Sequence, residues 1–299
     1  MALQGKVVVI TGASSGIGRA TAHRFAETGA RLVLAARRMK PLEAAVRECA
    51  KLGGQATAIQ ADVADPDSVE NLARRAIETY GRIDIWVNNA AVALYARIDE
   101  GPLEAHCRVI ETNLLGYLYG SRIALRIFRQ QGCGVLVNVC SATAYVGQPY
   151  SSAYVASKFA IRGLSESIRQ EVRDCPQIHV CTVMPGATDT PFFQHAGNYM
   201  GRVAQPLHPI ADARRVAKVI VAAAERPQRT SFVDIARVLP LLKAIAPGWI
   251  EAYVGNLVRK RQFRDEPAPA SPGNLFEPMA EGDDISGGWR EANTGYRRP

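Results

Sequence analysis

The sequence predicts a doubly wound α/β fold with a seven-stranded parallel sheet and helices on both of its faces. Short apolar runs alternate along the 299 residues with segments of helical periodicity, which is the pattern of successive βαβ units. The apolar runs have few polar interruptions, as expected for strands that are covered on both faces. A glycine-rich turn joins the first run to the first helical segment, and no internal repeat indicates another architecture.

Seven strands and six helical segments account for residues 1–235, which we expect to form one domain. The strands are expected at 6–11, 31–36, 56–61, 83–88, 135–140, 179–184 and 231–235. The helical segments are expected at 17–28, 41–52, 66–80, 103–131, 152–174 and 211–225. Crossovers between parallel strands are right-handed, and ligands bind beyond the carboxyl ends of such strands.

Residues 236–299 differ in character from this domain. Residues 236–262 read as a helical extension of two pieces that are broken near Pro247 and Gly248. We expect this pair to pack on the domain or on a sister subunit, in preference to docking on a membrane surface. Residues 263–299 are rich in proline, glycine and acids, which predicts a flexible tail, with Leu275 and Phe276 as its candidate anchors.

The composition narrows the possible functions. The net charge is +8, but the basic residues are spread over helix faces and no nucleic-acid-binding motif is present. We therefore attribute the charge to solvated faces and to one anionic cofactor, and we expect no nucleic-acid partner. The six cysteines and five histidines lack zinc-ligand spacing, so no metal site is expected. No apolar run spans a membrane and no signal-peptide cleavage site follows the start, which predicts a cytoplasmic protein.

The first strand leads into the sequence TGASSGIG at residues 11–18. Its glycines, Gly12, Gly16 and Gly18, lack side chains, so the backbone can turn sharply and approach a pyrophosphate at a helix N-terminus. Because the turn joins a strand to a helix at the start of a βαβ array, it predicts a dinucleotide site.

The second strand ends at Ala36, followed by Arg37 and Arg38. A site for NAD would carry an acid here to accept hydrogen bonds from the ribose 2′-hydroxyl. Two guanidinium groups suit a 2′-phosphate instead, and Ser14 in the glycine turn is placed to add a hydroxyl. The sequence therefore predicts NADP(H).

The stretch SSAYVASKFA, residues 151–160, places Tyr154 and Lys158 on one face of a helix, one turn apart. A free phenol has a pKa near 10, and a fixed cation nearby stabilises the phenolate and lowers that pKa. Tyr145 and Tyr150 have no lysine four residues later. Ser141 follows the fifth strand, where an active-site group is expected.

These motifs resemble the short-chain dehydrogenase/reductase family, in its smaller, non-epimerase subclass. The resemblance covers residues 5–228, and its motifs occur in the family's order and spacing. They are TGASSGIG, ADV at 61–63, NNA at 88–90, Asn113, Ser141, the Tyr154–Lys158 pair and PGATDT at 185–190. It implies that residues 1–235 form a dinucleotide-binding Rossmann catalytic domain. The implied activity is that of an NADP(H)-dependent carbonyl reductase or alcohol dehydrogenase.

The resemblance implies four catalytic residues. Tyr154 is the general acid or base, Lys158 also binds the nicotinamide ribose, and Ser141 holds the substrate oxygen. Asn113 is expected to hold a water that links the lysine to solvent. The residues expected to bind the cofactor are Gly12, Ser14, Ser15, Gly16, Ile17, Gly18, Arg37, Arg38, Asp62, Val63, Asn89, Ala90, Ala91, Tyr154, Lys158, Pro185, Gly186, Thr188 and Thr190. One departure is Ala91, where the family commonly has glycine, and a positive φ there would be strained.

The residues expected to face the substrate are mostly apolar, which favours a lipid-like, steroid-like or aromatic ketone without excluding a small ketone or an acyl chain on a carrier. They are Ser141, Val92, Leu94, Ala142, Tyr145, Gln148, Tyr150, Phe192 and Phe193, and residues 191–210 are expected to form a mobile substrate loop. A cofactor-binding regulatory protein without turnover is the alternative function. An epimerase or dehydratase would need a longer substrate domain. The long helices 103–131 and 152–174 resemble those that pair across a two-fold axis in the family, which predicts a homodimer or homotetramer.

Overall fold

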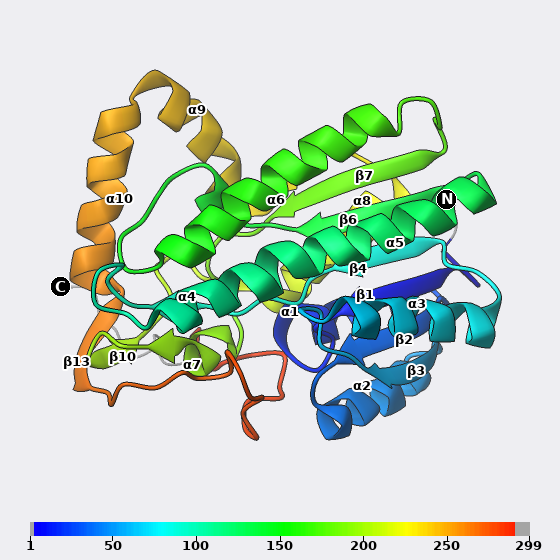
Figure 1. The fold of residues 1–299 in the computed structure, drawn as a ribbon, viewed down its shortest axis with the longest axis horizontal. Helices are drawn as coiled ribbons and strands as arrows, with labels where there is room; N and C mark the ends of the chain where they lie inside the picture. Colours follow the sequence, from blue (N-terminus) through cyan, green and yellow to red (C-terminus); the bar gives the residue numbers. More distant parts are fainter. Residues whose placement is uncertain (1–2, 291–299) are drawn as a thin grey trace.

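The computed structural model describes residues 3–290, and a seven-stranded sheet lies at its centre (Figure 1). The neighbouring strands are all parallel, in the order β12-β7-β6-β4-β1-β2-β3. Their bounds are β1 (Val7–Thr11), β2 (Arg31–Ala36), β3 (Gln55–Gln60), β4 (Ile85–Asn88), β6 (Gly134–Val139), β7 (Ile178–Met184) and β12 (Thr230–Phe232). The predicted fold class is confirmed, and the order reverses between β1 and β4, where ligands of doubly wound sheets bind.

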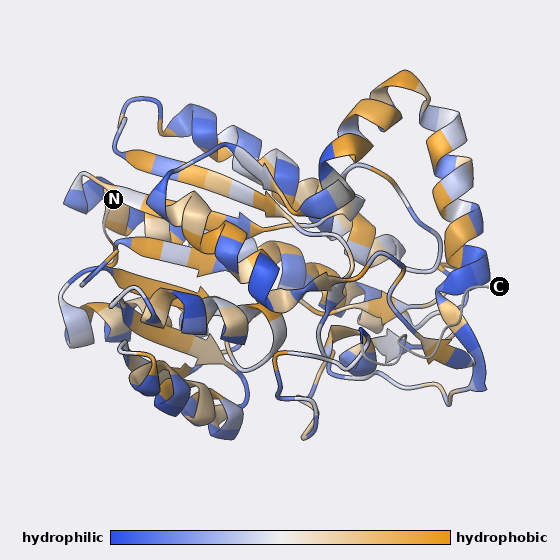
Figure 2. Cartoon of the chain, turned by 180° about the vertical axis from the view of Figure 1, so that it is seen from behind, coloured by the Kyte–Doolittle hydropathy of each residue, from blue (hydrophilic) through white to orange (hydrophobic). Residues whose placement is uncertain are grey.

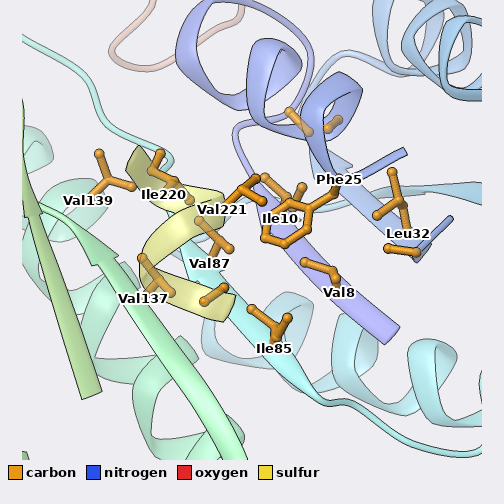
Figure 3. Close-up of a cluster of buried hydrophobic side chains, with 14 of the residues drawn as sticks. Val8, Ile10, Phe25, Leu32, Ile85, Val87, Val137, Val139, Ile220 and Val221 are labelled. Atoms are coloured by element: carbon orange, nitrogen blue, oxygen red, sulfur yellow. The ribbon is translucent and has the colours of Figure 1, made fainter. Parts of the chain in front are cut away.

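Helices cover both faces of the sheet. One face carries α1 (Gly16–Ala26), α2 (Met39–Lys51) and α8 (Ala213–Glu225), and the other carries α3 (Pro66–Tyr80), α5 (Gly116–Gln131) and α6 (Ser152–Glu171). Alternate residues of β1 serve the two sides: Val8 and Ile10 pack under α1 and α8, whereas Val9 belongs to the opposite cluster (Figure 3). The apolar residues of β1 are therefore buried on both faces of the sheet.

The single helix expected at 103–131 is three segments in the structure. α4 (Leu103–Ile110) leads into one π-helical turn, η1 (Glu111–Leu115), and then into α5. Asn113 lies in this turn, and its side-chain amide is hydrogen-bonded to the main chain of Val92. A wider turn of this kind re-aims side chains within a helix and is frequent at functional sites.

Short elements order residues 191–210, which we expected as a mobile loop. They are α7 (Phe192–His195), β9 (Gly197–Asn198) and β10 (Arg202–Ala204), and β8 (Thr188–Asp189) and β11 (Ala211–Asp212) flank them. β9 pairs with β5 (Leu94–Tyr95), β11 pairs with β8, and β10 pairs with β13 (Phe263–Pro267). Residues 191–210 thus form two strand pairings, through β9 and β10, and the pairing of β8 with β11 joins the residues on either side of the segment. Two 3₁₀ turns, η2 (Ala142–Ala144) and η3 (Asp234–Val238), lie elsewhere in the chain.

Two helices stand at one end of the domain, as the break near Pro247 predicts. α9 (Leu239–Ile245) and α10 (Pro247–Arg261) form a hairpin (Figure 1). Leu241, Ile245 and Trp249 of this hairpin are each more than 60% exposed. Figure 2 shows hydrophobic residues in both helices. Among residues 3–290, no helix combines the length and the apolar character needed to cross a membrane.

Residues 263–290 differ from the expected flexible tail. They begin with β13 and continue along the domain, held by hydrogen bonds from Arg37, Arg38 and Arg108 to main-chain carbonyls. Leu275 is fully buried, as expected of an anchor, whereas Phe276 is 43% exposed. Every residue offers a main-chain carbonyl as a hydrogen-bond acceptor, so arginine side chains can order even a segment rich in proline and glycine. Residues 291–299 of the predicted tail lie outside the described residues.

Candidate active site

The glycine turn between β1 and α1 brings the main chain close to its neighbours. A Cβ atom on Gly12 would lie 2.8 Å from the Ala90 Cα, and one on Gly18 would lie 2.1 Å from the Gly12 carbonyl oxygen. Both separations are too short for a side chain, so glycine is required at both positions. The turn places the amino-terminal N–H groups of α1 beside the carboxyl end of β1, where an anion would be stabilised.

Tyr154 and Lys158 lie one turn apart on α6, as the sequence predicts. The buried Lys158 ammonium lies 5.5 Å from the centre of the Tyr154 ring and 5.2 Å from that of Tyr117. It donates a hydrogen bond to the Val139 carbonyl at 3.2 Å. Burial lowers the pKa of Lys158 to about 8. The ammonium is therefore fixed beside the phenol, in a place where keeping it charged costs free energy.

Ser141 follows β6 and lies within reach of the Tyr154 hydroxyl. Its hydroxyl oxygen accepts a hydrogen bond from Thr143 N at 3.2 Å. Burial raises the pKa of Tyr154, and a hydrogen bond with Ser141 opposes that rise. We expected the neighbouring cation to lower the pKa of the phenol. In the structure desolvation is the larger effect because the side chain is enclosed in the site, so the phenol is protonated at neutral pH.

Asn113 ties the loop after β4 to helix α6. Its Oδ1 accepts a hydrogen bond from Val92 N at 2.8 Å, and its Nδ2 donates to Val92 O at 2.9 Å and to Ser157 Oγ at 3.2 Å. Ser157 Oγ in turn donates to the Tyr154 carbonyl at 2.7 Å. Asn113 thus fixes the backbone on both sides of the site, and the water expected beside it stays a prediction.

The groups after β2 and β3 form a basic cluster. Arg37 and Arg38 donate hydrogen bonds to main-chain carbonyls of residues 274–282. Burial is the larger effect on both guanidinium groups and lowers their pKa. Asp62, after β3, accepts a hydrogen bond from Arg108 at 2.6 Å. Arg37, Arg38 and Asp62 follow the carboxyl ends of β2 and β3, and Arg108, from α4, reaches this edge of the sheet through Asp62.

All the residues that the sequence assigns to a cofactor line one cavity of about 790 Å³. The cavity runs from the glycine turn to Tyr154 and Lys158, and it includes Asp62, the 89–91 segment and the 185–190 segment. Among the described residues, positive φ outside glycine is confined to Tyr150 and Asp234. Ala91 therefore has an ordinary backbone conformation, and the strain considered for it is absent.

Three of the residues expected to face a substrate lie elsewhere. Leu94 is 2% exposed and packs in a buried cluster, while its neighbour Tyr95 lines the cavity, because successive side chains of a strand point to opposite faces. Tyr145 packs on Phe232 and under the Arg162 guanidinium, and Tyr150 packs on Phe263. Ser141, Val92, Ala142, Gln148, Phe192 and Phe193 do line the cavity.

Several lining residues escaped the sequence reasoning. The α9–α10 hairpin contributes Leu242, Ile250, Tyr253 and Leu257, so its inner side forms an apolar wall of the same cavity. Residues from beyond β13 also line the cavity, namely Asn274, Pro278, Met279 and Arg290. An apolar stripe on a helix indicates that one face is buried, but it does not indicate what the face covers.

The geometry fits a dinucleotide. The glycine turn leaves room for a pyrophosphate at the start of α1, and the basic cluster lies at one end of the cavity. A phenol, an ammonium and a serine hydroxyl lie at the other end. An extended anionic molecule that spans this cavity would therefore have its charged part at the turn and its far end at Tyr154.

Comparisons with known proteins agree with this assignment. A family model described as short chain dehydrogenase matches residues 6–200. An uncharacterized oxidoreductase of Bacillus subtilis, YxnA, is 34% identical over 305 residues, covering 99% of this chain and 85% of the relative. The 3beta-hydroxysteroid dehydrogenase 1 of Eggerthella lenta is 36% identical over 191 residues, covering 63% of this chain and 73% of the relative.

Solved structures show the same fold. An alcohol dehydrogenase from the archaeon Thermococcus sibiricus, complexed with 5-hydroxy-NADP, matches with a TM-score of 0.67 and 29% identity. The match covers 77% of this chain and 95% of that one. A short-chain type dehydrogenase/reductase from Mycobacterium marinum matches with a TM-score of 0.69 and 28% identity, covering 78% of this chain and 95% of that one.

Proposed function

Because the chain belongs to the short-chain dehydrogenase family, we propose that it is an NADP(H)-dependent oxidoreductase that interconverts a ketone or aldehyde and an alcohol. The observation that carries this proposal is the meeting of Ser141, Tyr154 and Lys158 in a cavity that continues to the glycine turn. A bound nicotinamide would supply or accept the hydride, and the chain's own residues would handle the substrate oxygen and the proton.

Tyr154 is proposed as the proton donor to the substrate oxygen during reduction. Its raised pKa keeps the proton on the phenol at neutral pH, which suits a general acid. Ser141, which is hydrogen-bonded to Tyr154, would hold the same substrate oxygen in the polarised geometry. Lys158 would stabilise the phenolate left behind, because its ammonium is fixed 5.5 Å from the ring.

Asn113 is proposed to be a positioning residue, which holds the main chain around Tyr154 in place. Its hydrogen bonds to Val92 and Ser157 hold the loop after β4 at a fixed distance from α6. The family role, in which the residue holds a water that links the lysine to solvent, is retained as part of the proposal.

The cofactor is proposed to be NADP(H). Ala36 leaves the position of a ribose-binding acid without a carboxylate, and the basic side chains of Arg37 and Arg38 lie at that end of the cavity. The Thermococcus sibiricus structure contains an NADP derivative, which supports a phosphorylated cofactor in this chain as well. A phosphate monoester would find paired, charge-assisted hydrogen bonds here.

The substrate is proposed to be apolar. Val92, Phe192 and Phe193 line the cavity near Tyr154, and the rings of Tyr154 and Phe192 lie 5.7 Å apart. The hairpin extends this apolar wall through Ile250, Tyr253 and Leu257. The Eggerthella lenta relative is named for action on a hydroxysteroid, an apolar alcohol, which is consistent with the cavity.

A panel of apolar ketones and alcohols, followed by the absorbance of NADPH, tests this proposal. Turnover of at least one apolar carbonyl compound with NADPH is expected. Tight NADPH binding with no turnover across the panel would favour the alternative, a cofactor-binding regulatory protein. The cytoplasmic location and the homodimer or homotetramer expected from the sequence are retained as predictions.

A further inference from the structure

A segment beyond β13, residues 272–289, lies along the mouth of the cofactor cavity, and we call it the C-terminal strap. Its path starts beside Arg37 and Arg38, crosses the beginning of α1, and ends at the β8 turn. These three places correspond to the adenosine, pyrophosphate and nicotinamide parts of the proposed dinucleotide site. No step of the proposed reaction uses this segment, and local sequence signals do not predict its position.

At the adenosine end the strap holds both arginines by main-chain carbonyls. The terminal nitrogens of Arg37 donate to the carbonyls of three successive residues, at 2.5 Å to Asn274, 3.2 Å to Leu275 and 3.0 Å to Phe276. Those of Arg38 donate to residues 279, 281 and 282 at 2.9, 2.8 and 3.1 Å. Each guanidinium group is therefore held by hydrogen bonds from its terminal nitrogens to the strap.

The middle of the strap lies on the glycine turn. Gly16 N, at the start of α1, donates to the Asp284 carbonyl at 3.0 Å. Arg19, which is 7% exposed, donates to the Asp283 carbonyl at 2.5 Å and forms an ion pair with Glu48. The strap thus covers the first turn of the helix that is proposed to bind the pyrophosphate.

The far end of the strap is anchored beside the proposed nicotinamide site. Asp189 accepts hydrogen bonds from Ser286 Oγ at 2.8 Å, Gly287 N at 3.0 Å and Trp289 N at 2.9 Å. The Trp289 indole, 7% exposed, donates to the Thr190 carbonyl at 3.0 Å. Asp189 and Thr190 lie in the same 185–190 segment that lines the cavity.

The strap is a wall of the cavity and not a plug. Asn274, Pro278 and Met279 line the same cavity as the glycine turn, and about 790 Å³ stays open with the strap in place. A guanidinium has five N–H donors. The strap uses three of those on Arg37, all on the terminal nitrogens, and leaves Nε–H and one Nη2 hydrogen for another acceptor.

We infer that the C-terminal strap is the outer wall of the cofactor site and positions Arg37 and Arg38 for the 2′-phosphate. The inference rests on the proposed function, since it assigns the wall of the same site. Holding a guanidinium in place before the ligand arrives removes the entropy cost of ordering that side chain on binding. The strap should therefore favour NADPH more than NADH, and the bound cofactor should stabilise the strap by the same coupling.

Full-length variants with substitutions at two glycines test this inference. A Cβ on Gly273 would lie 2.3 Å from the His195 carbonyl, and one on Gly287 would lie 2.4 Å from the Thr190 carbonyl. Gly273→Val and Gly287→Val should therefore lift the strap at either end. The exposed residue Ala270, just before the strap, provides the control Ala270→Val.

The measurements are the Kd of NADPH and of NADH, from titration of nicotinamide fluorescence, and hydrogen exchange of residues 272–289. Gly273→Val should weaken NADPH binding by about tenfold or more, the effect of losing about one charge-assisted hydrogen bond. It should weaken NADH binding less, and Ala270→Val should change neither. In the wild type, NADPH should slow hydrogen exchange of the strap. Thermal melts would show whether each variant keeps its fold.

The possible outcomes distinguish failure of this inference from failure of the proposed function. Unchanged NADPH binding in both folded glycine variants would overturn the inference and leave the proposed function standing. Faster exchange of the strap on adding NADPH would overturn it too, because the strap would then be competing with the phosphate for the arginines. A wild type that binds neither cofactor would overturn the proposed function, and the inference with it.

Discussion

Replacing Lys158 with methionine should make the protein more stable at neutral pH and much less active. Burial lowers the pKa of Lys158 from its ordinary 10.5 to about 8. At about 1.4 kcal/mol per pKa unit, keeping this ammonium charged costs the folded state about 3 kcal/mol. Methionine has a similar length and no charge. The Val139 carbonyl keeps a partner in the variant, because the Tyr117 hydroxyl also donates to it, at 2.7 Å.

The sign of the pH dependence follows from the same pKa. Between about pH 8 and about pH 10 the folded wild type loses the Lys158 proton while the unfolded chain still holds it, so the free energy of unfolding rises with pH. The methionine variant lacks this rise. Urea unfolding of both proteins at pH 7 and near pH 10 should show the variant more stable by roughly 1–3 kcal/mol at pH 7, with the difference shrinking at high pH. A variant less stable than the wild type at pH 7 would refute the reasoning.

Three further predictions concern the cofactor and the assembly. The double change Ala36→Asp with Arg37→Ile should reverse the preference from NADPH to NADH in kcat/KM. In the wild type, added salt should weaken NADPH binding more than NADH binding. Equal efficiency with both cofactors in the wild type would contradict the predicted preference for NADPH. Gly18→Ala should lower the free energy of unfolding by about 1–3 kcal/mol and weaken cofactor binding, because the new Cβ would lie 2.1 Å from the Gly12 carbonyl; an unchanged urea midpoint would argue against the close approach. Light scattering should show a dimer or tetramer at micromolar concentration, and the mass of a monomer alone would count against the predicted pairing of long helices.

The parts of the molecule that the sequence predicted are those with local signals. The second strand was expected at 31–36 and the third helix at 66–80, and both have these bounds in the structure. The helix at 66–80 follows an Asp65 cap and ends at Gly81 with positive φ, which are local signals at the two ends of the helix. The Tyr154–Lys158 pair was likewise visible because helical spacing alone puts the two side chains on one face.

The parts that sequence reasoning missed depend on long-range or non-specific contacts. The choice between Leu94 and Tyr95 as the cavity-facing residue depends on the orientation of a two-residue strand, which is too short for a periodic signal. The strap is held to Arg37 by carbonyls more than 230 residues away. Every residue has a main-chain carbonyl, so the composition of 263–299, with its few apolar anchors, did not indicate that the segment would be ordered.

A comparison of Tyr154→Phe with the wild type, in both turnover and cofactor binding, tests whether Tyr154 is the proton donor. The variant should lose at least about a hundredfold in kcat, the typical contribution of a general acid. Its Kd for NADPH and its thermal melt should stay close to those of the wild type, because the ring is kept and only the hydroxyl is removed. A folded Phe variant that binds NADPH and keeps more than about a tenth of the wild-type rate would contradict the role of Tyr154 as the proton donor.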